Sequence, residues 1–239
     1  MLRRSVAIVL VGCVIAVAGY FHFKSFSPDR QRYPVRGIDV SHHQGDIDWA
    51  RVAADDVDFA IIKATEGGDH RDRLFAANLA AARKAGLAVG AYHFFTFCRP
   101  GADQARNFID TVPFDPSLLP PVVDIEFTGN CLRRPSVEQL RAELAAFLAP
   151  IEASFGKKAI IYLTDEAADA YAQAMPDRER WVRSLIQHPG HEDWTYWQYH
   201  DKGRVDGIDG NVDLNVLQGR LSRLTDPFAA TTAQEGAFK

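Results

Sequence analysis

The sequence predicts an α/β fold, an irregular TIM-like barrel in which five βα units are followed by three closely spaced strands. Eight apolar segments recur between residues 37 and 216, and several are almost continuously apolar, as is typical of parallel strands covered on both faces. From the second segment to the fifth, successive starts are about 30, 33 and 37 residues apart, and the later intervals shrink to about 23, 13 and 18. The longer intervals have room for a strand and a crossover helix, whereas the last three are too short for complete βα units.

The predicted strands are, in order, Gly37–Ser41, Asp58–Ala64, Ala88–Phe95, Pro121–Glu126, Lys158–Leu163, Trp181–Leu185, Trp194–Tyr199 and Val212–Val216. Helical patterns lie between the early strands. After the second strand, apolar residues within Leu74–Ala82 share one helix face, and Gly86 suits the end of that helix. After the fourth strand, Ser136 and Gln139 form a capping box ahead of an apolar stripe within Leu140–Ile151.

The first 23 residues predict export. Met1–Arg4 is basic, and Ser5–Phe21 contains seventeen residues without a charge, a pattern that directs the following chain across a membrane. Three interpretations stay open: a signal peptide removed after Ala16–Ala18, an uncleaved anchor at the lower length limit for a membrane span, and a lipoprotein modified at Cys13. Each places the body in the periplasm, outside the cell, or anchored at the outer face of the cytoplasmic membrane.

The rest of the chain divides into a polar linker at 24–34, one catalytic barrel at 35–220 and a polar tail at 221–239. Without the first 33 residues the net charge is −8, and no basic stripe is present. This charge argues against a nucleic-acid partner. We expect a monomer whose only contact with a membrane is made by the N-terminal segment.

Two cysteines, Cys98 and Cys131, lie in the predicted barrel. An oxidising compartment favours a disulfide between them, and free thiols are the alternative. Cys98 follows the third strand and Cys131 the fourth, so their loops should meet on one face and the bridge should close a loop of about 33 residues. The sequence contains no CxxC motif and no His/Cys metal spacing, so we predict no cofactor and no metal.

Four acidic residues interrupt apolar strands near their ends: Asp39, Asp124, Glu126 and Asp213. The active sites of parallel barrels lie at the C-terminal edge of the strands, and an ionised carboxylate is costly there unless it is paired or functional. Structural ion pairs are the alternative. Asp124 and Glu126 are two residues apart and should therefore point the same way. Two close acids push their pKa values apart, so one acts as a proton donor while the other stays ionised, as glycoside cleavage requires.

Five motifs, in this order, resemble the family 25 glycoside hydrolases, the muramidase type of lysozyme: GIDVSHHQG, FAIIKATEG, GLAVGAYHFF, PPVVDIE and WQYHDKGRVDGIDGNVDLN. The resemblance covers roughly Arg36–Gln218. It implies an irregular barrel of five βα units plus three strands. It also implies hydrolysis of the β-1,4 bond from N-acetylmuramic acid to N-acetylglucosamine in the glycan strands of peptidoglycan.

Carried over by motif, Glu126 resembles the family's acid/base, Asp124 its neighbouring essential acid, and Asp39 and Asp213 the flanking acids of the groove. The arrangement of Asp124 and Glu126 is also similar to that of hydrolases in which the 2-acetamido group of the sugar is the nucleophile, which gives net retention. Direct double displacement and inversion stay open as alternatives. The segment WVRSL departs from the family's usual pattern, and its arginine, Arg183, predicts an altered sugar-binding subsite.

Further candidates for sugar contacts are Lys63, Tyr162, Trp197 and Tyr199, with barrel-rim or core packing as the alternative interpretation. His42, His43 and His93 suggest a metal, but adjacent residues of a strand point to opposite faces, so we predict no metal site. Two other functions were weighed against the muramidase. One is a catalytically inactive peptidoglycan-binding module, and the other is a metal-dependent polysaccharide deacetylase.

Overall fold

The structure is a computed structural model that describes residues 19, 26–191 and 193–225. Apart from Gly19, the predicted signal peptide or anchor at 1–23 lies outside the described residues, as does the predicted tail beyond residue 225. Among the described residues, no helix is both long enough and apolar enough to span a bilayer.

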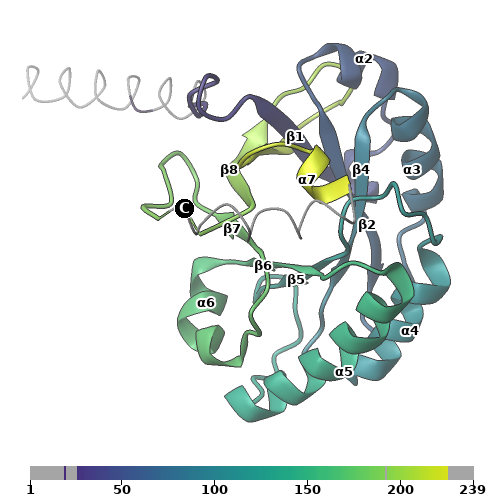
Figure 1. The fold of residues 1–239 in the computed structure, drawn as a ribbon, viewed down its shortest axis with the longest axis vertical. Helices are drawn as coiled ribbons and strands as arrows, with labels where there is room; N and C mark the ends of the chain where they lie inside the picture. The colour runs from purple at the N-terminus through teal and green to yellow at the C-terminus, as the bar shows by residue number, and fades with distance from the viewer. Residues whose placement is uncertain (1–18, 20–25, 192, 226–239) are drawn as a thin grey trace, which may run out of the picture.

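Eight strands form a closed barrel (Figure 1). They are β1 (Val35–Val40), β2 (Phe59–Glu66), β4 (Ala88–Phe94), β5 (Val122–Ile125), β6 (Ile160–Leu163), β7 (Arg180–Arg183), β8 (Tyr196–Gly203) and β9 (Val212–Leu217). Each pairs with the next in this order, and β9 pairs with β1 to close the ring. A further two-residue strand, β3 (His70–Arg71), pairs with the end of β2. The eight predicted strands are all present, with ends that shift by a few residues, and β3 was not predicted.

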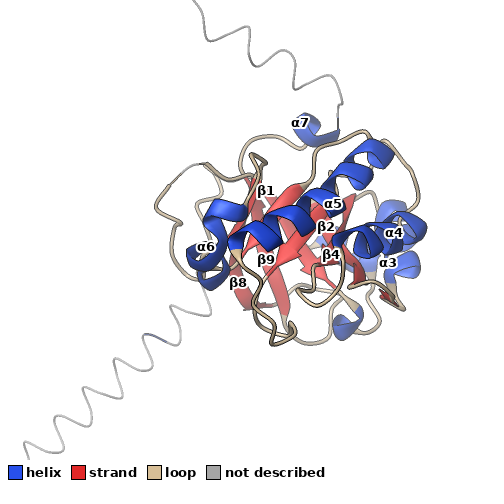
Figure 2. Ribbon diagram, turned by 90° about the horizontal axis from the view of Figure 1, so that it is seen from below, coloured by secondary structure: helices blue, strands red, loops and turns tan. Residues whose placement is uncertain are grey.

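Helices follow the first five barrel strands, and the described residues between the last three barrel strands contain no helix. The helices are α2 (Trp49–Ala54), α3 (Phe75–Lys84), α4 (Gly101–Thr111), α5 (Val137–Phe155), α6 (Asp165–Tyr171) and α7 (Ser222–Thr225), with short 3-10 helices at His42–Gln44 and Ala172–Ala174. Figure 2 shows α5 lying across the strands, with α6 and α4 near its two ends. The predicted pattern of five βα units followed by three strands is confirmed.

Local sequence explains where α5 begins and ends. The Ser136 side chain accepts a hydrogen bond from the Gln139 N–H, and the Gln139 side chain accepts one from the Ser136 N–H. This is the predicted capping box, which satisfies two N–H groups that the first helical turn leaves unpaired. The helix ends at Gly156, whose φ of 67° is readily adopted only by glycine. Its buried face is the predicted apolar stripe, within Leu140–Ile151.

Alternate side chains of each strand divide between two layers of the core. In β2, Phe59 and Ile61 pack with the cluster inside the barrel, while Ala60 and Ile62 pack toward the helices. Phe59 in turn requires a glycine opposite it, because a Cβ on Gly37 would lie 2.3 Å from its ring. This two-sided burial explains why the strand sequences are almost continuously apolar.

The last strand runs against the others. Strands β1 to β8 of the barrel are parallel, and β9 is antiparallel to both of its neighbours. Val35 at the start of β1 therefore pairs with Leu217 at the end of β9, and Asp39 pairs with Asp213. The prediction that Asp213 lies at the C-terminal end of a strand is wrong, because it is the second residue of β9. Antiparallel direction brings that N-terminal end to the rim where the parallel strands finish.

The described part of the predicted linker, residues 26–34, packs on the barrel. The Arg36 guanidinium donates hydrogen bonds of 2.8 Å to the Ser27 hydroxyl and to the Pro28 carbonyl. Phe26 and Tyr33 join an aromatic cluster outside β8. This segment is thus part of the folded domain, although its composition is polar.

Candidate active site

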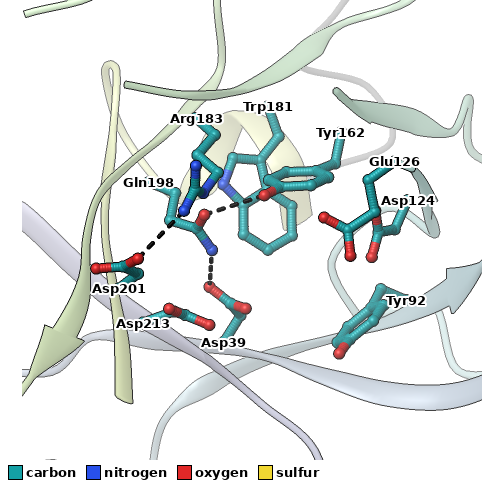
Figure 3. A pocket seen from close by; sticks show the side chains of 10 residues that line it. All are labelled: Asp39, Tyr92, Asp124, Glu126, Tyr162, Trp181, Arg183, Gln198, Asp201 and Asp213. Carbon is teal, nitrogen blue, oxygen red and sulfur yellow. Dashed lines mark hydrogen bonds and ion pairs between the residues drawn. The ribbon is translucent and has the colours of Figure 1, made fainter. Parts of the chain in front are cut away.

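A pocket of about 220 Å³ opens at the rim formed by the C-terminal ends of the parallel strands (Figure 3). All four predicted acids line it. The full lining consists of Asp39, Tyr92, Asp124, Glu126, Tyr162, Trp181, Arg183, Gln198, Asp201 and Asp213. The barrel strands explain this convergence, because Asp39 and Asp124 lie near the ends of β1 and β5 and Glu126 directly follows β5. The pair Asp124 and Glu126 faces the same cavity, as the alternation of a strand predicts.

Asp39 is held by two amide side chains. Gln198 Nε2 and Asn215 Nδ2 donate to its Oδ2 over 3.0 and 2.7 Å. Trp181 Nε1 donates to Asn215 Oδ1 over 2.9 Å. Because an indole N–H can only donate, that bond fixes which end of the Asn215 amide faces Asp39. The Tyr162 hydroxyl donates to Gln198 Oε1 over 3.0 Å, so the Gln198 amide links Tyr162 to Asp39.

Asp213 and Asp39 share a side-chain hydrogen bond. Burial, followed by the charge of Asp39, raises the pKa of Asp213 to about 9. Burial also raises the pKa of Asp39, although hydrogen bonds from Asn215, Gln198 and Asp213 oppose that shift. Asp213 therefore keeps its proton at neutral pH and donates it to Asp39 in a hydrogen bond.

Asp124 and Glu126 have a different environment. Burial raises the pKa of Glu126 to about 7, and the cations Arg183 and Lys63 partly oppose the shift. Burial, and then the charge of Glu126, raises the pKa of Asp124 well above its ordinary value. Asp124 Oδ1 is buried and has no hydrogen-bond partner among the described residues. An unpaired buried acceptor is costly, so this oxygen is suited to a group that a ligand supplies.

Among the described residues that line the pocket, Arg183 is the single cationic one. Its Nη2 donates to Asp201 Oδ2 over 3.2 Å (Figure 3). The side chain is 36% exposed, and that of Asp201 is 29% exposed. The sequence singled out Arg183 as a departure from its resemblance, and the structure places it beside the carboxyls.

The candidates for sugar contacts separate into two groups. Tyr162 lines the pocket. Lys63 does not line it, but forms an ion pair of 2.7 Å with Glu66 and lies 4.9 Å from the centre of the Phe94 ring. Trp197 and Tyr199 share a face as predicted, but that face is buried in the aromatic cluster outside the barrel. Their placement favours the packing alternative, and Gln198 between them is the residue of this segment that enters the pocket.

Four pocket residues were not predicted: Tyr92, Trp181, Gln198 and Asp201. Tyr92 and Trp181 lie within apolar strand sequences, where nothing distinguishes an aromatic side chain at a site from one in the core. Asp201 is two residues beyond Tyr199, so strict alternation would place it on the outer face; register shifts in the pairing of β8 with β9 after Gln198 break that alternation, and the sequence does not show them.

The histidines have structural partners. His93 is buried between the Thr65 hydroxyl, 2.7 Å from Nδ1, and the Gln104 side chain, 3.0 Å from Nε2. Burial lowers the pKa of His93 to about 3. His42 Nδ1 lies 2.8 Å from Asp72 Oδ2. Within the described part of the chain, no group of three or more His, Cys, Asp or Glu side chains is arranged to hold a metal ion.

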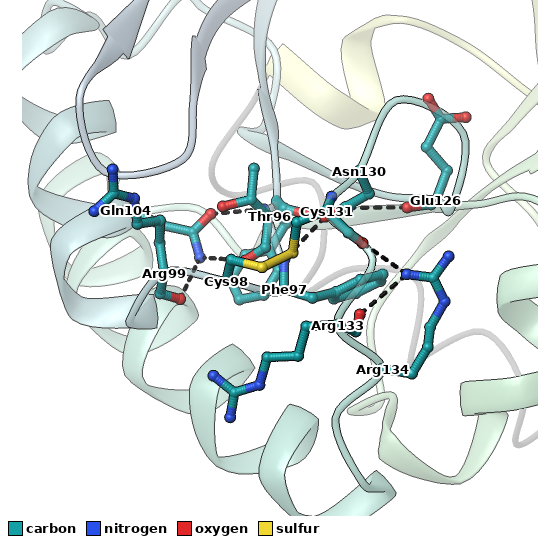
Figure 4. Close-up of a disulfide and its surroundings, with 11 residues drawn as sticks. Thr96, Phe97, Cys98, Arg99, Gln104, Glu126, Asn130, Cys131, Arg133 and Arg134 are labelled. Atoms are coloured by element: carbon teal, nitrogen blue, oxygen red, sulfur yellow. Dashed lines mark hydrogen bonds between the residues drawn. A yellow bond between two sulfur atoms is a disulfide. The ribbon is translucent and has the colours of Figure 1, made fainter.

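The two cysteines form the predicted disulfide (Figure 4). Their Cα atoms are 6.3 Å apart, and the bridge joins the loop after β4 to the loop after β5. It therefore lies on the side of the barrel where Glu126 emerges.

Residues 38–208 match the sequence model of glycosyl hydrolases family 25. The chain belongs to this family. It is a glycoside hydrolase, and its barrel geometry and carboxyl-lined pocket agree with that assignment.

Named relatives in the family include lysozymes. The chain is 35% identical over 208 residues to Lysozyme M1 from Streptomyces globisporus, which covers 80% of this chain and 70% of that protein. It is 37% identical over 229 residues to the uncharacterized protein YegX from Escherichia coli K12, covering 88% of this chain and 82% of YegX.

Solved structures show the same architecture. A family 25 glycosyl hydrolase from Bacillus anthracis has a TM-score of 0.76 and 40% identity, covering 82% of this chain and 94% of that one. A bacterial lysozyme from Streptomyces coelicolor has a TM-score of 0.72 and 34% identity, covering 82% of this chain and 98% of that one.

Proposed function

We propose that this enzyme is a muramidase that cleaves the β-1,4 bond between N-acetylmuramic acid and N-acetylglucosamine in peptidoglycan. Glu126 is the acid/base and Asp124 the assisting carboxyl. The observation that supports this assignment best is the contrast within one pocket between these two groups. Glu126 has a pKa of about 7, suited to giving and taking a proton near neutral pH, while the buried Asp124 Oδ1 has no partner.

In the first step, Glu126 gives its proton to the leaving glycosidic oxygen, and the bond from that oxygen to C1 breaks. The carbonyl oxygen of the sugar's own 2-acetamido group forms a bond to C1 from the opposite face. The acetamido N–H becomes strongly acidic as positive charge develops on the group. Asp124 Oδ1 accepts a hydrogen bond from it, and the nearby positive charge favours the ionised form of Asp124.

In the second step, the Glu126 carboxylate takes a proton from water, and that water attacks C1. The bond from C1 to the acetamido oxygen breaks, and the sugar regains its original β configuration. Asp39 and Asp213 form the opposite wall of the pocket, with Gln198 and Asn215 holding Asp39 in place. NMR of the anomer first released from a short muro-oligosaccharide tests this step, because an α product would contradict retention.

The proposal extends to the setting in which the enzyme works. Residues 1–23 direct the chain out of the cytoplasm as a signal peptide or an anchor. Residues 35–220 act as a monomeric catalytic barrel on glycan strands. Lysozymes and an autolytic lysozyme among the relatives support a cell-wall substrate.

The decisive experiment is digestion of a purified cell-wall suspension. Loss of turbidity, with reducing N-acetylmuramic acid on the released fragments by mass spectrometry, supports the proposal. Fragments that end in reducing N-acetylglucosamine contradict it. Binding to the cell wall without any cleavage indicates an inactive binding module, and chelator-sensitive release of acetate indicates a deacetylase.

A further inference from the structure

The segment after Glu126 is a tight turn that brings the chain back toward β4. The Asn130 N–H donates to the Phe127 carbonyl over 3.2 Å, and Gly129 has a φ of 76°, which favours glycine. Asn130 is thereby placed beside the backbone of Glu126, four residues after it.

The Asn130 amide makes four hydrogen bonds. Its Nδ2 donates to the carbonyls of Phe95 and Glu126 over 2.8 and 2.9 Å. Its Oδ1 accepts from the N–H groups of Phe97 and Cys131, each over 3.0 Å. An amide side chain has two N–H donors and an oxygen with two lone pairs, so its bonding capacity is filled. Figure 4 shows this amide between the two loops, next to the disulfide.

These bonds take the place of the backbone hydrogen bonds that would continue the pairing of β4 with β5. The Phe95 N–H donates to the Asp124 carbonyl over 2.9 Å, as in regular parallel pairing of β4 with β5. If β5 continued, the Phe95 carbonyl and the Phe97 N–H would pair with the backbone of Glu126. The Asn130 amide bonds both of these groups instead and holds the Glu126 carbonyl as well. The direction in which Glu126 leaves the strand is therefore set by a side chain.

Three further contacts hold this turn. Cys131, next to Asn130, is bonded to Cys98 in the loop that also contains Phe97. The Phe127 ring lies 5.8 Å from that of Phe97, and the Arg134 guanidinium lies 4.3 Å from the centre of the Phe127 ring. The turn is fixed on both sides, which is unusual for an exposed loop.

We propose that Asn130 is a positioning residue for the Glu126 carboxyl, and that the Cys98–Cys131 disulfide acts on the reaction by keeping Asn130 in place. This inference rests on the proposed role of Glu126. Asn130 is not among the residues that line the pocket. It controls where the acid/base stands, and thus how well the carboxyl reaches the glycosidic oxygen and how far burial raises its pKa.

The test is Asn130→Ala, compared with Asn107→Ala. Asn107 is a matched control, because its Nδ2 also donates to two backbone carbonyls, those of Gly67 and His70, over 3.1 and 2.9 Å. Neither residue lines the pocket. Both variants should lose thermal stability. Asn130→Ser serves in the same comparison if Asn130→Ala does not fold.

We expect Asn130→Ala to lower kcat about 10²-fold, the cost of a misplacement of about 1 Å, with little change in KM. The fall of kcat/KM at high pH should move to lower pH, because a Glu126 carboxyl less deeply buried has a lower pKa. Asn107→Ala should keep both kcat and the pH profile. If the two variants behave alike, the positioning role is contradicted.

A double-mutant cycle tests the role of the disulfide. Cys98→Ser with Cys131→Ser should lower kcat, and adding Asn130→Ala should then cost much less than it does in the wild type, because both changes act on the same turn. Independent, multiplying losses of kcat would overturn this part of the proposal.

The result for Glu126→Gln separates failure of the proposed function from failure of the positioning role. If that variant keeps its activity, the proposed function fails. If it is inactive and Asn130→Ala matches Asn107→Ala, only the positioning role fails.

Discussion

The buried Asp39 and the half-buried Asp124 are both acids at the rim of one pocket, yet their surroundings are opposite. Asp39 receives hydrogen bonds from Gln198, Asn215 and a protonated Asp213. Asp124 has an oxygen without a partner and the charge of Glu126 beside it. Side chains of the protein satisfy the first carboxyl, whereas no described residue satisfies Oδ1 of the second.

This difference indicates how a barrel with several acids at its rim assigns separate tasks to them. A carboxylate with all its hydrogen bonds made is held rigidly, and its negative charge needs no reorganisation during the reaction. A buried carboxyl oxygen without a hydrogen bond is destabilising, and a hydrogen bond from a bound sugar removes that cost. The following substitutions test this difference between the rim carboxyls.

The largest effect is expected for Glu126→Gln, which keeps the shape of the side chain and removes its proton. General acid–base catalysis contributes about 10²–10⁴-fold, so kcat on a soluble muro-oligosaccharide should fall by at least that factor. Glu138→Gln, which changes an exposed carboxyl of α5 outside the pocket, is the matched control and should stay near the wild type. A folded Glu126→Gln enzyme with more than a tenth of the wild-type kcat would refute the assignment.

The next effect separates Asp39 from Asp124 directly. Asp39→Asn loses charge-assisted hydrogen bonds, each of which contributes about 1.5–3 kcal/mol, so its free energy of unfolding in denaturant should fall by at least this amount. Asp124→Asn removes a carboxyl with no partner on Oδ1 and should keep or raise stability while kcat falls. Equal losses of stability in the two variants would contradict the contrast.

A smaller change is expected from Arg183→Gln. Because the Arg183 charge lowers the pKa of Glu126, its removal should raise that pKa, and the fall of kcat/KM above pH 7 or so should move to higher pH. Arg178→Gln, whose guanidinium pairs with Glu152 at 2.6 Å, is the control. A shift to lower pH, or no shift, would show that Arg183 does not act on Glu126.

The smallest effect concerns stability against pH. The folded-state pKa values of Glu126 and Asp213, about 7 and about 9, lie above the ordinary 4.5 and 3.8. Groups with raised pKa values stabilise the fold fully below their unfolded pKa, and this contribution is lost as pH rises through the folded pKa. Tm should therefore decline from about pH 5 to pH 9, and Glu126→Gln should flatten the lower part of that decline. A wild-type Tm that rises over this range would be the contrary result.

The sequence predicted the barrel well because its strands are nearly continuous apolar runs at informative spacings. Two features escaped it for physical reasons. A two-residue strand such as His70–Arg71 has too few residues to show any period. The direction of β9 was also hidden, because side chains alternate with period two whichever way a strand runs.

The same limit explains which residues of the site the sequence could identify. A charge inside an apolar run is conspicuous, so Asp39, Asp124, Glu126 and Asp213 could be found from the sequence. Alternation shows that Trp197 and Tyr199 share a face, but only the pairing of Arg183 with Gln198 across β7 and β8 decides which face looks into the pocket. The Asn130 hydrogen bonds with Phe95 and Phe97 were invisible, since they join segments more than thirty residues apart in the chain.

The pairing of Val35 with Leu217 brings the two ends of the barrel sequence next to each other. The first and last strands are neighbours, and both outer ends lie away from the rim where Asp39 pairs with Asp213. A short peptide could join those ends and new termini could be opened in a surface loop, which is circular permutation. By the same geometry, the whole hydrolase could be inserted into a loop of another protein through two adjacent attachment points, with its pocket facing outward.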